Sequence, residues 1–185
     1  MSTLSPESTD YEIKITDELE AFRRAVREFA EKELAPATQR IDKENQMDME
    51  LVKHAAKLGL FGVPFPEEYG GGGGDDLSLV VATEEIARFS AAFSAVVGAT
   101  YLVSTPIFLF GTEEQKRKYL VPIAKGEKIA AHAMTEPGTG SDVAAITTTA
   151  KKVGDKYVIN GKKMFITNGD KADIFLIFAR TSPKE

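Results

Sequence analysis

The sequence predicts an α+β protein, in which an N-terminal all-α helical bundle precedes an incomplete antiparallel β-domain. Two observations predict this class. Apolar residues recur at helical spacing through the first two thirds of the 185 residues, and β-branched residues alternate with polar ones in the last third. The period changes near residue 128. We therefore expect a helical domain over residues 1–128 and the first part of a β-domain over residues 129–185.

Caps and prolines define the first two helices. Thr16 can cap a helix whose apolar residues recur every three or four positions, and Pro36 follows after at least four turns. A second helix is predicted from about Asp48 to Leu58, because its apolar residues share one side and Pro64 and Pro66 stop the pattern.

Three more helices are predicted from about Asp76 to Phe89, from about Ala91 to Phe110, and from Glu113 to Ile123 after a capping Thr112. The stretch 89–112 has no charged residue and is long enough to span a bilayer. It contains several serines and threonines, however, and charged amphipathic segments flank it. We therefore expect a helix buried inside the helical domain and no membrane span.

The last third predicts a β-meander. Strands are expected at residues 147–153, 157–159, 164–167 and 174–178. Gly154-Asp155 and Asn160-Gly161 are typical of hairpin turns. A sheet this short, ending on an open edge, is expected to be incomplete.

Composition excludes several functions. The chain has no Cys, which excludes disulfides and Cys nucleophiles, and its two His, His54 and His132, are too few for a His-based metal site. The net charge is −5 and basic residues are not clustered, so we expect no nucleic-acid partner. The first ten residues are polar and acidic without signal or transit character. We therefore expect a cytoplasmic protein, or a mitochondrial matrix protein if the source is eukaryotic.

Two glycine-containing segments differ in what they predict. Gly70 to Gly74 precede Asp75 and Asp76, which would repel phosphate, so this run is interpreted as a flexible or tightly turning connector. The segment 135–142, TEPGTGSD, places glycines beside hydroxyls, so its N–H groups and oxygens can converge on a polar ligand. On spacing alone it can equally be a polar loop before a strand.

Two further patterns leave alternatives open. Phe165 and Thr167 are expected on one face of a strand, as a ligand surface or as an edge aromatic beside a solvated Thr. Ser94, Gly98 and Leu102 lie on one stripe of the uncharged helix, where small residues permit tight helix packing or a groove for an apolar ligand.

Four segments together resemble the acyl-CoA dehydrogenase family. Residues 133–145, AMTEPGTGSDVAA, resemble its flavin loop, with Thr139 where a smaller residue is commoner. Residues 161–169, GKKMFITNG, resemble its second flavin strand, with Phe165 where Trp is common. Residues 66–71, PEEYGG, and 111–116, GTEEQK, are similar to segments of its helical domain. The four matches occur in the family's order and span most of the chain.

The resemblance implies FAD and a site that binds an acyl-CoA thioester. An α-proton leaves to a carboxylate base, and hydride passes from the β-carbon to flavin N5, giving a trans-2-enoyl-CoA. By resemblance, the Thr167 hydroxyl lies near N5, Phe165 covers the ring, and Thr135 and the N–H groups around Met134 face the pyrimidine end. The expected FAD-contacting residues are His132, Ala133, Met134, Thr135, Gly140, Ser141, Phe165, Ile166 and Thr167. The expected substrate-contacting residues are Ser141, which would meet the CoA part, and Ser94, Gly98 and Leu102, which would follow the acyl tail.

The resemblance also implies what the chain lacks. In this family the base lies in a C-terminal helical domain, and no residue here matches it, so we expect no catalytic base in this chain and no turnover by the 185 residues alone. The expected partners are an electron-transfer flavoprotein and further copies in a dimer or tetramer, with a role in fatty acid or amino acid catabolism. Alternatives are an acyl-CoA oxidase or flavin monooxygenase of the same fold, and a non-catalytic acyl- or partner-binding module.

Overall fold

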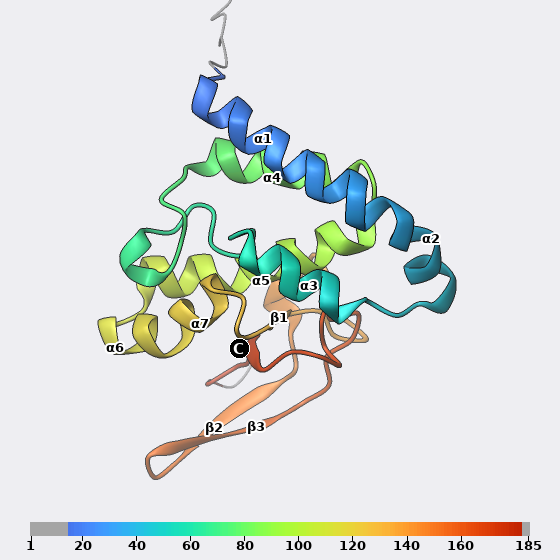
Figure 1. Ribbon diagram of the computed structural model, residues 1–185. Helices are drawn as coiled ribbons and strands as arrows, with labels where there is room; N and C mark the ends of the chain where they lie inside the picture. The colour runs from blue at the N-terminus through green and yellow to red at the C-terminus, as the bar shows by residue number, and fades with distance from the viewer. Residues whose placement is uncertain (1–14, 183–185) are drawn as a thin grey trace, which may run out of the picture.

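The structure, a computed structural model, describes residues 15–182 and has a helical body with strands on one side (Figure 1). The polar N-terminal segment discussed above lies outside the described residues, apart from its junction with the first helix. The observed class is α+β, as the sequence predicts.

The first helical rod is longer than its sequence suggests. Helix α1, Asp17–Phe29, begins where the Thr16 hydroxyl accepts a hydrogen bond from Leu19 N, as predicted. The rod does not end before Pro36. It passes through a π-helical turn into α2, Ala35–Glu44, because Pro36 falls at the start of α2, where a missing N–H costs little. Asn45, in the left-handed conformation, ends α2.

The remaining helices lie close to their predicted positions. They are α3 (Met49–Lys57), α4 (Asp76–Ala87), α5 (Ala91–Phe110), α6 (Glu113–Gln115) and α7 (Val121–Ala124). A π-helical turn joins α6 to α7, so the predicted helix from Glu113 to Ile123 is continuous but irregular. Asp48, Asp75, Ser90 and Thr112 cap the starts of α3 to α6 with their side chains.

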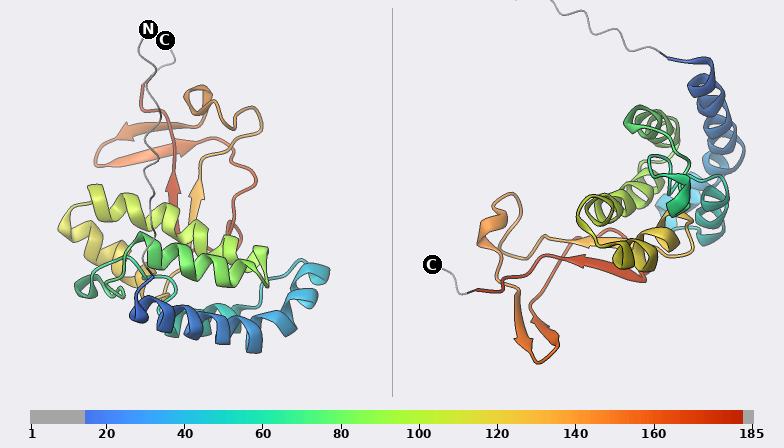
Figure 2. Two further views of the ribbon diagram at one scale, coloured as in Figure 1. Left: turned by 90° about the horizontal axis from the view of Figure 1, so that it is seen from above. Right: turned by 90° about the vertical axis from the view of Figure 1, so that its left-hand side faces the viewer.

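Helix α5 lies at the centre of the molecule. By length and composition alone it could cross a membrane, but here it packs against α4 on one side and against strand β1, Ala130–Ala133, on the other (Figures 1 and 2). Phe93 and Val103 are fully buried on it, and the Tyr101 hydroxyl donates to Leu60 O at 2.7 Å. Burial on opposite sides is the pattern of a core helix, which explains an uncharged sequence without a membrane.

The predicted antiparallel meander is wrong in its topology. The strands β2 (Thr149–Val153) and β3 (Lys156–Asn160) form the expected hairpin around Gly154, but β4 (Ile174–Ile177) pairs in parallel with β1. His132 lies opposite Leu176 in that pair. The sequence did not predict β1 as a strand, because Ala-Ala-His-Ala contains no β-branched residue.

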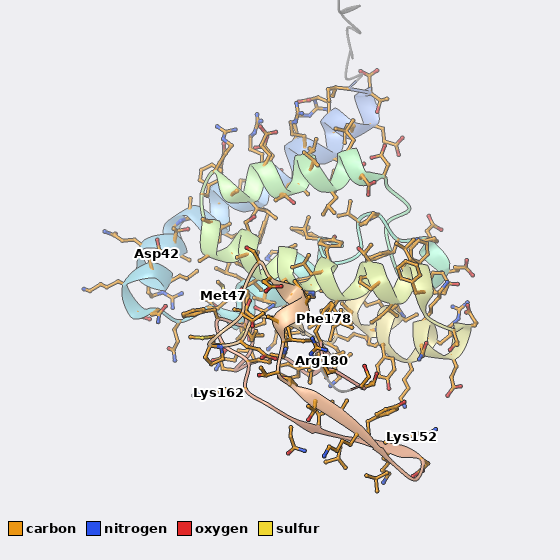
Figure 3. The ribbon with its side chains drawn as sticks, turned by 180° about the vertical axis from the view of Figure 1, so that it is seen from behind. Asp42, Met47, Lys152, Lys162, Phe178 and Arg180 are labelled. Carbon is orange, nitrogen blue, oxygen red and sulfur yellow. The ribbon has the colours of Figure 1, made fainter. Side chains whose placement is uncertain are left out.

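Residues 161–173 contain no strand, so the expected strand at 164–167 and the hairpin turn at Asn160-Gly161 are both wrong. Gly161 instead lies against Thr148, where an added Cβ would come within 2.2 Å of the hydroxyl oxygen. Phe165 adopts a positive φ of 56°, which a regular strand does not allow. The hairpin tip, near Lys152, therefore extends away from the helices while residues 161–173 return to them (Figure 3).

The glycine run is a tightly turning connector. Gly70 has φ +81° and the N–H groups of Gly72, Gly73 and Gly74 donate to carbonyls of the preceding turn, at Gly62, Phe65 and Val63. These N–H groups are used within the protein, which is why the run has no capacity left to bind a phosphate.

Candidate functional site

Strand β1 leads directly into the candidate loop. His132 is half-buried on it and its ring meets that of Phe178, beyond the end of β4, edge to face with centroids 5.1 Å apart. Burial lowers the pKa of His132, so the imidazole is held neutral at physiological pH. This environment fits a packing role and not that of a proton carrier.

The loop after β1 folds back at once. Backbone hydrogen bonds in both directions between Glu136 and Thr139, 2.9 and 3.1 Å long, close a tight turn. Beyond it Gly140, Ser141 and Asp142 are exposed, and a Cβ added at Gly140 would meet nothing within 4 Å. The loop therefore presents free backbone and a hydroxyl to an open space.

Glu136 organises this loop from inside. Its carboxylate is buried and accepts hydrogen bonds from Thr147 N and Oγ1 at 2.7 and 2.6 Å, from Thr148 N at 3.0 Å and from Lys163 Nζ at 2.9 Å. Hydrogen bonds from the Thr147 side chain, from Thr148 and from Lys163 hold the pKa of Glu136 well below its usual range. This carboxylate orients the backbone of the loop. Its low pKa makes it a poor proton acceptor.

The segment 161–169 lies against the same loop. Lys163 Nζ also donates to Met134 O at 2.9 Å, and Met164 N donates to Thr135 O at 3.0 Å. Two predicted flavin segments, 30 residues apart in sequence, therefore meet side by side. Phe165 follows directly with 85% of its surface exposed, and Thr167 is exposed as well.

Asn168 joins this segment to the helical domain. Its side-chain amide donates to Val96 O of α5 at 3.2 Å and to Ala130 O of β1 at 3.1 Å. A cavity of about 330 Å³ adjoins this contact, with Thr167 and Val96 in its wall. The Thr167 end of the segment is thereby fixed beside α5.

The stripe on α5 is open. Ser94 and Gly98 are half-buried, Leu102 is 56% exposed, and a Cβ added at Gly98 would meet nothing within 4 Å. Within residues 15–182 nothing packs closely on Gly98. Contact of the stripe with an acyl tail stays a prediction, as does its alternative, packing against another helix. Gly140 and Ser141 lie on the exposed loop, and none of the hydrogen bonds among the described residues joins them to this stripe.

Sequence reasoning missed Lys163 and Asn168. Lys162 and Lys163 are adjacent and alike in sequence, and only the fold shows that Lys163 is half-buried while Lys162 is exposed. The sequence around Glu136 is polar and gave no sign that this carboxylate is buried and paired with a lysine.

Together these features fit a planar polar ring. The exposed Phe165, the exposed Thr167, the half-buried Thr135 and a loop of open glycines lie along two adjacent segments. A ring stacked on Phe165 could receive hydrogen bonds from hydroxyl and backbone donors at its edge.

Comparison with known proteins identifies the fold family. The acyl-CoA dehydrogenase N-terminal domain matches residues 16–127 and the acyl-CoA dehydrogenase middle domain matches residues 131–185. The chain belongs to the acyl-CoA dehydrogenase family.

Individual relatives agree. A short-chain specific acyl-CoA dehydrogenase of Clostridium acetobutylicum is 49% identical over 92% of this chain. A chain in a structure described as the electron transferring flavoprotein of Acidaminococcus fermentans superposes with a TM-score of 0.89 at 44% identity, covering 92% of this chain and 45% of that one. An acyl-CoA dehydrogenase complexed with FAD from Bacillus anthracis superposes with a TM-score of 0.85 at 39% identity. The match covers 91% of this chain and 29% of that one. The chain spans about 45% of the length of the Clostridium relative.

Proposed function

We propose that this chain supplies the FAD-binding and acyl-binding surfaces of an enzyme that oxidises an acyl-CoA thioester to a trans-2-enoyl-CoA. One observation carries the proposal: the two family segments, 133–145 and 161–169, meet through Lys163 and Met164, and Asn168 joins the second segment to α5. FAD, when bound, supplies the hydride acceptor for such a reaction. The division at residue 128 into helical and β parts is part of this proposal.

The chain's own residues bind and orient. Thr167 offers a hydroxyl donor at the centre of the ring edge, Phe165 offers an apolar face, and Thr135 with the backbone around Met134 offers donors where the reduced ring gathers negative charge. His132, Ala133, Ile166 and Gly140 complete the proposed ring surface. Ser141 is proposed to contact the CoA part, and the stripe of Ser94, Gly98 and Leu102 to contact the acyl tail.

The base is a separate requirement. The α-proton of a thioester is weakly acidic, so its removal needs a positioned group of matched basicity. Among the described carboxylates near the loop, Glu136 is buried in hydrogen bonds and its pKa is held low, and Asp142 projects from the exposed loop. We therefore place the base outside residues 15–182, and expect the 185-residue chain alone to be inactive.

Electrons must then leave the flavin. An electron-transfer flavoprotein is the proposed electron acceptor. The similarity to a chain in a structure described as an electron transferring flavoprotein supports this choice. A homo-oligomer, cytoplasmic location and a role in fatty acid or amino acid catabolism complete the proposal.

Anaerobic addition of short acyl-CoAs to the FAD-loaded protein of natural length tests this function. The proposal expects the flavin absorbance to bleach with at least one acyl-CoA and the reduced flavin to reoxidise slowly in air but quickly with an electron-transfer flavoprotein. Rapid reoxidation by oxygen indicates an oxidase instead. A colourless protein that still binds acyl-CoA indicates a non-catalytic module.

A further inference from the structure

The two proposed flavin segments are held together by few backbone contacts. Among the described residues, one backbone hydrogen bond, from Met164 N to Thr135 O, joins segment 161–169 to residues 130–136. A sheet would supply a ladder of such bonds that fixes the register. Something other than strand pairing must therefore set how Phe165 and Thr167 lie relative to Thr135.

Side chains supply the missing constraint. Lys163 Nζ donates to Met134 O and to Glu136 Oε1, both at 2.9 Å, so one ammonium group binds backbone and carboxylate of the other segment at once. The exposed fractions of the two side chains are 12% for Lys163 and 3% for Glu136. Charge-assisted bonds in such a desolvated setting are stronger and shorter than neutral ones.

The carboxylate extends the link to a third segment. Glu136 accepts from the N–H groups of Thr147 and Thr148 at 2.7 and 3.0 Å, at the entrance to β2. Four donors on one buried carboxylate leave it little freedom to rotate. Glu136 therefore holds the loop before β2, while Lys163 holds the segment after β3, against the end of β1.

We propose that Glu136 and Lys163 are positioning residues, which fix the two flavin-contacting segments relative to each other without touching the flavin themselves. The inference rests on the proposed function and adds the residues that preorganise its site. The low pKa of Glu136 agrees with it, because the carboxylate stays charged and keeps attracting the ammonium group across the physiological range.

A buried ion pair elsewhere in the molecule provides the matched control. Glu85 is also 3% exposed and pairs with Arg27 Nη2 at 2.6 Å, but this pair joins α4 to α1, in the helical domain. Lys163→Met leaves the buried Glu136 carboxylate without its cation, whereas Arg27→Met removes the shortest of three Glu85 ion pairs and leaves those with Arg88 and Arg23, at 3.3 and 3.9 Å. Both changes are expected to lower stability. Only the Lys163 pair is expected to affect the flavin.

The experiment compares Lys163→Met, Lys163→Arg, Glu136→Gln, the double variant Glu136→Gln/Lys163→Met, and Arg27→Met in the FAD-loaded protein of natural length. For each we measure the Kd for FAD, the visible spectrum and midpoint potential of the bound flavin, and the Tm. Hydrogen exchange at the amides of Thr147, Thr148 and Met164 reports the positions of the segments without any flavin.

We expect Lys163→Met to weaken FAD binding about ten-fold and to shift the spectrum, with faster exchange at Met164, since the segments lose both hydrogen bonds of the ammonium group. Lys163→Arg keeps a cation, so its Kd for FAD is expected to stay within about three-fold of the wild-type value. The double variant is expected to lose no more FAD affinity than Lys163→Met alone, because the two residues act as a unit. Arg27→Met should lower the Tm and leave the Kd, spectrum and potential unchanged.

Two failures are distinguishable. If wild type binds no FAD, the proposed function fails and this inference falls with it. If wild type binds FAD and Lys163→Met matches Arg27→Met, with a lower Tm but an unchanged Kd, potential and Met164 exchange, the pair is only structural and the proposed function stands.

Discussion

At the scale of single residues, the side chains of the candidate site are of two kinds. Some are exposed and available to a ligand, and others are turned inward and fix the backbone. Thr167 and Phe165 are exposed on a segment with no regular structure, whereas Glu136 and Asn168 turn inward and bind backbone groups. The exposed residues are free to meet a ligand because the inward ones fix the chain beneath them.

Removing the Thr167 hydroxyl tests the proposed role of an exposed side chain. We expect Thr167→Ala to slow reduction of bound flavin by acyl-CoA about ten-fold, because one lost hydrogen bond near the reacting atom costs about 1–2 kcal/mol. Stopped-flow absorbance measures the rate. Thr167→Ser keeps the hydroxyl and should retain most of the reduction rate. Equal rates in Thr167→Ala and wild type would refute a role of the hydroxyl in flavin reduction.

The Glu136 carboxylate predicts a pH dependence of folding. Its pKa lies below the ordinary value of 4.5, so the folded protein resists protonation more than the unfolded chain does. Its contribution is complete above about pH 4.5 and is lost progressively as the pH falls below that value. Urea midpoints measured between neutral and acidic pH should therefore fall more steeply for wild type than for Glu136→Gln. Any fall that remains in Glu136→Gln belongs to the other carboxylates. Parallel curves of urea midpoint against pH for the two proteins would contradict the lowered pKa of Glu136.

At the scale of elements, local signals predicted more than long-range pairing did. Helix α5 has the predicted bounds and the caps at Thr16 and Thr112 are where their side chains indicate. The parallel pairing of β1 with β4 and the irregular segment 161–173 were not predicted. Caps and periodicity are properties of a few adjacent residues, whereas pairing between strands 40 residues apart depends on how α5 and the loops pack.

The glycine run illustrates a local element with a steric cause. A Cβ at Gly71 would lie 2.0 Å from Phe65 O, whereas one at Gly72 would lie 3.5 Å from Val63 O, an ordinary contact. We expect Gly71→Ala to lower the free energy of unfolding by about 1–3 kcal/mol, and Gly72→Ala to change it by much less. Urea titration of both variants measures this, and equal effects would show that backbone flexibility, not the close approach, decides the sequence.

The stripe of Ser94, Gly98 and Leu102 on α5 gives a second prediction at this scale. The space at Gly98 is open, so Gly98→Leu should fold normally and shorten the acyl chain that the protein accepts, with Gly98→Ala intermediate. The Kd values for a series of acyl-CoAs measure the preference. An unchanged preference in a folded Gly98→Leu variant would show that the acyl tail lies elsewhere.

At the scale of the whole molecule, the site lies where the helical body meets the strands. Resemblance to a family singled out both proposed flavin segments in the sequence, but not how the segments meet. That meeting depends on Lys163 and Asn168, which one sequence does not distinguish from other polar residues of a loop, because their partners are carbonyl oxygens distant in the chain. Burial and hydrogen-bond partners become visible only in the folded protein.

Flavin contact at Phe165 is the central claim, and the sequence offers a clean probe because it contains no Trp. Phe165→Trp introduces a single indole at the proposed ring surface, and Val80→Trp introduces one at an exposed position of α4, which lies across α5 from the strands (Figure 1). Tryptophan emission is measured while each folded variant is titrated with FAD, under conditions in which both bind it equally. The account predicts that the Phe165→Trp variant loses most of its emission as FAD binds, whereas the Val80→Trp variant keeps most of it. Equal loss of emission in the two variants, or none in the Phe165→Trp variant, would contradict the account.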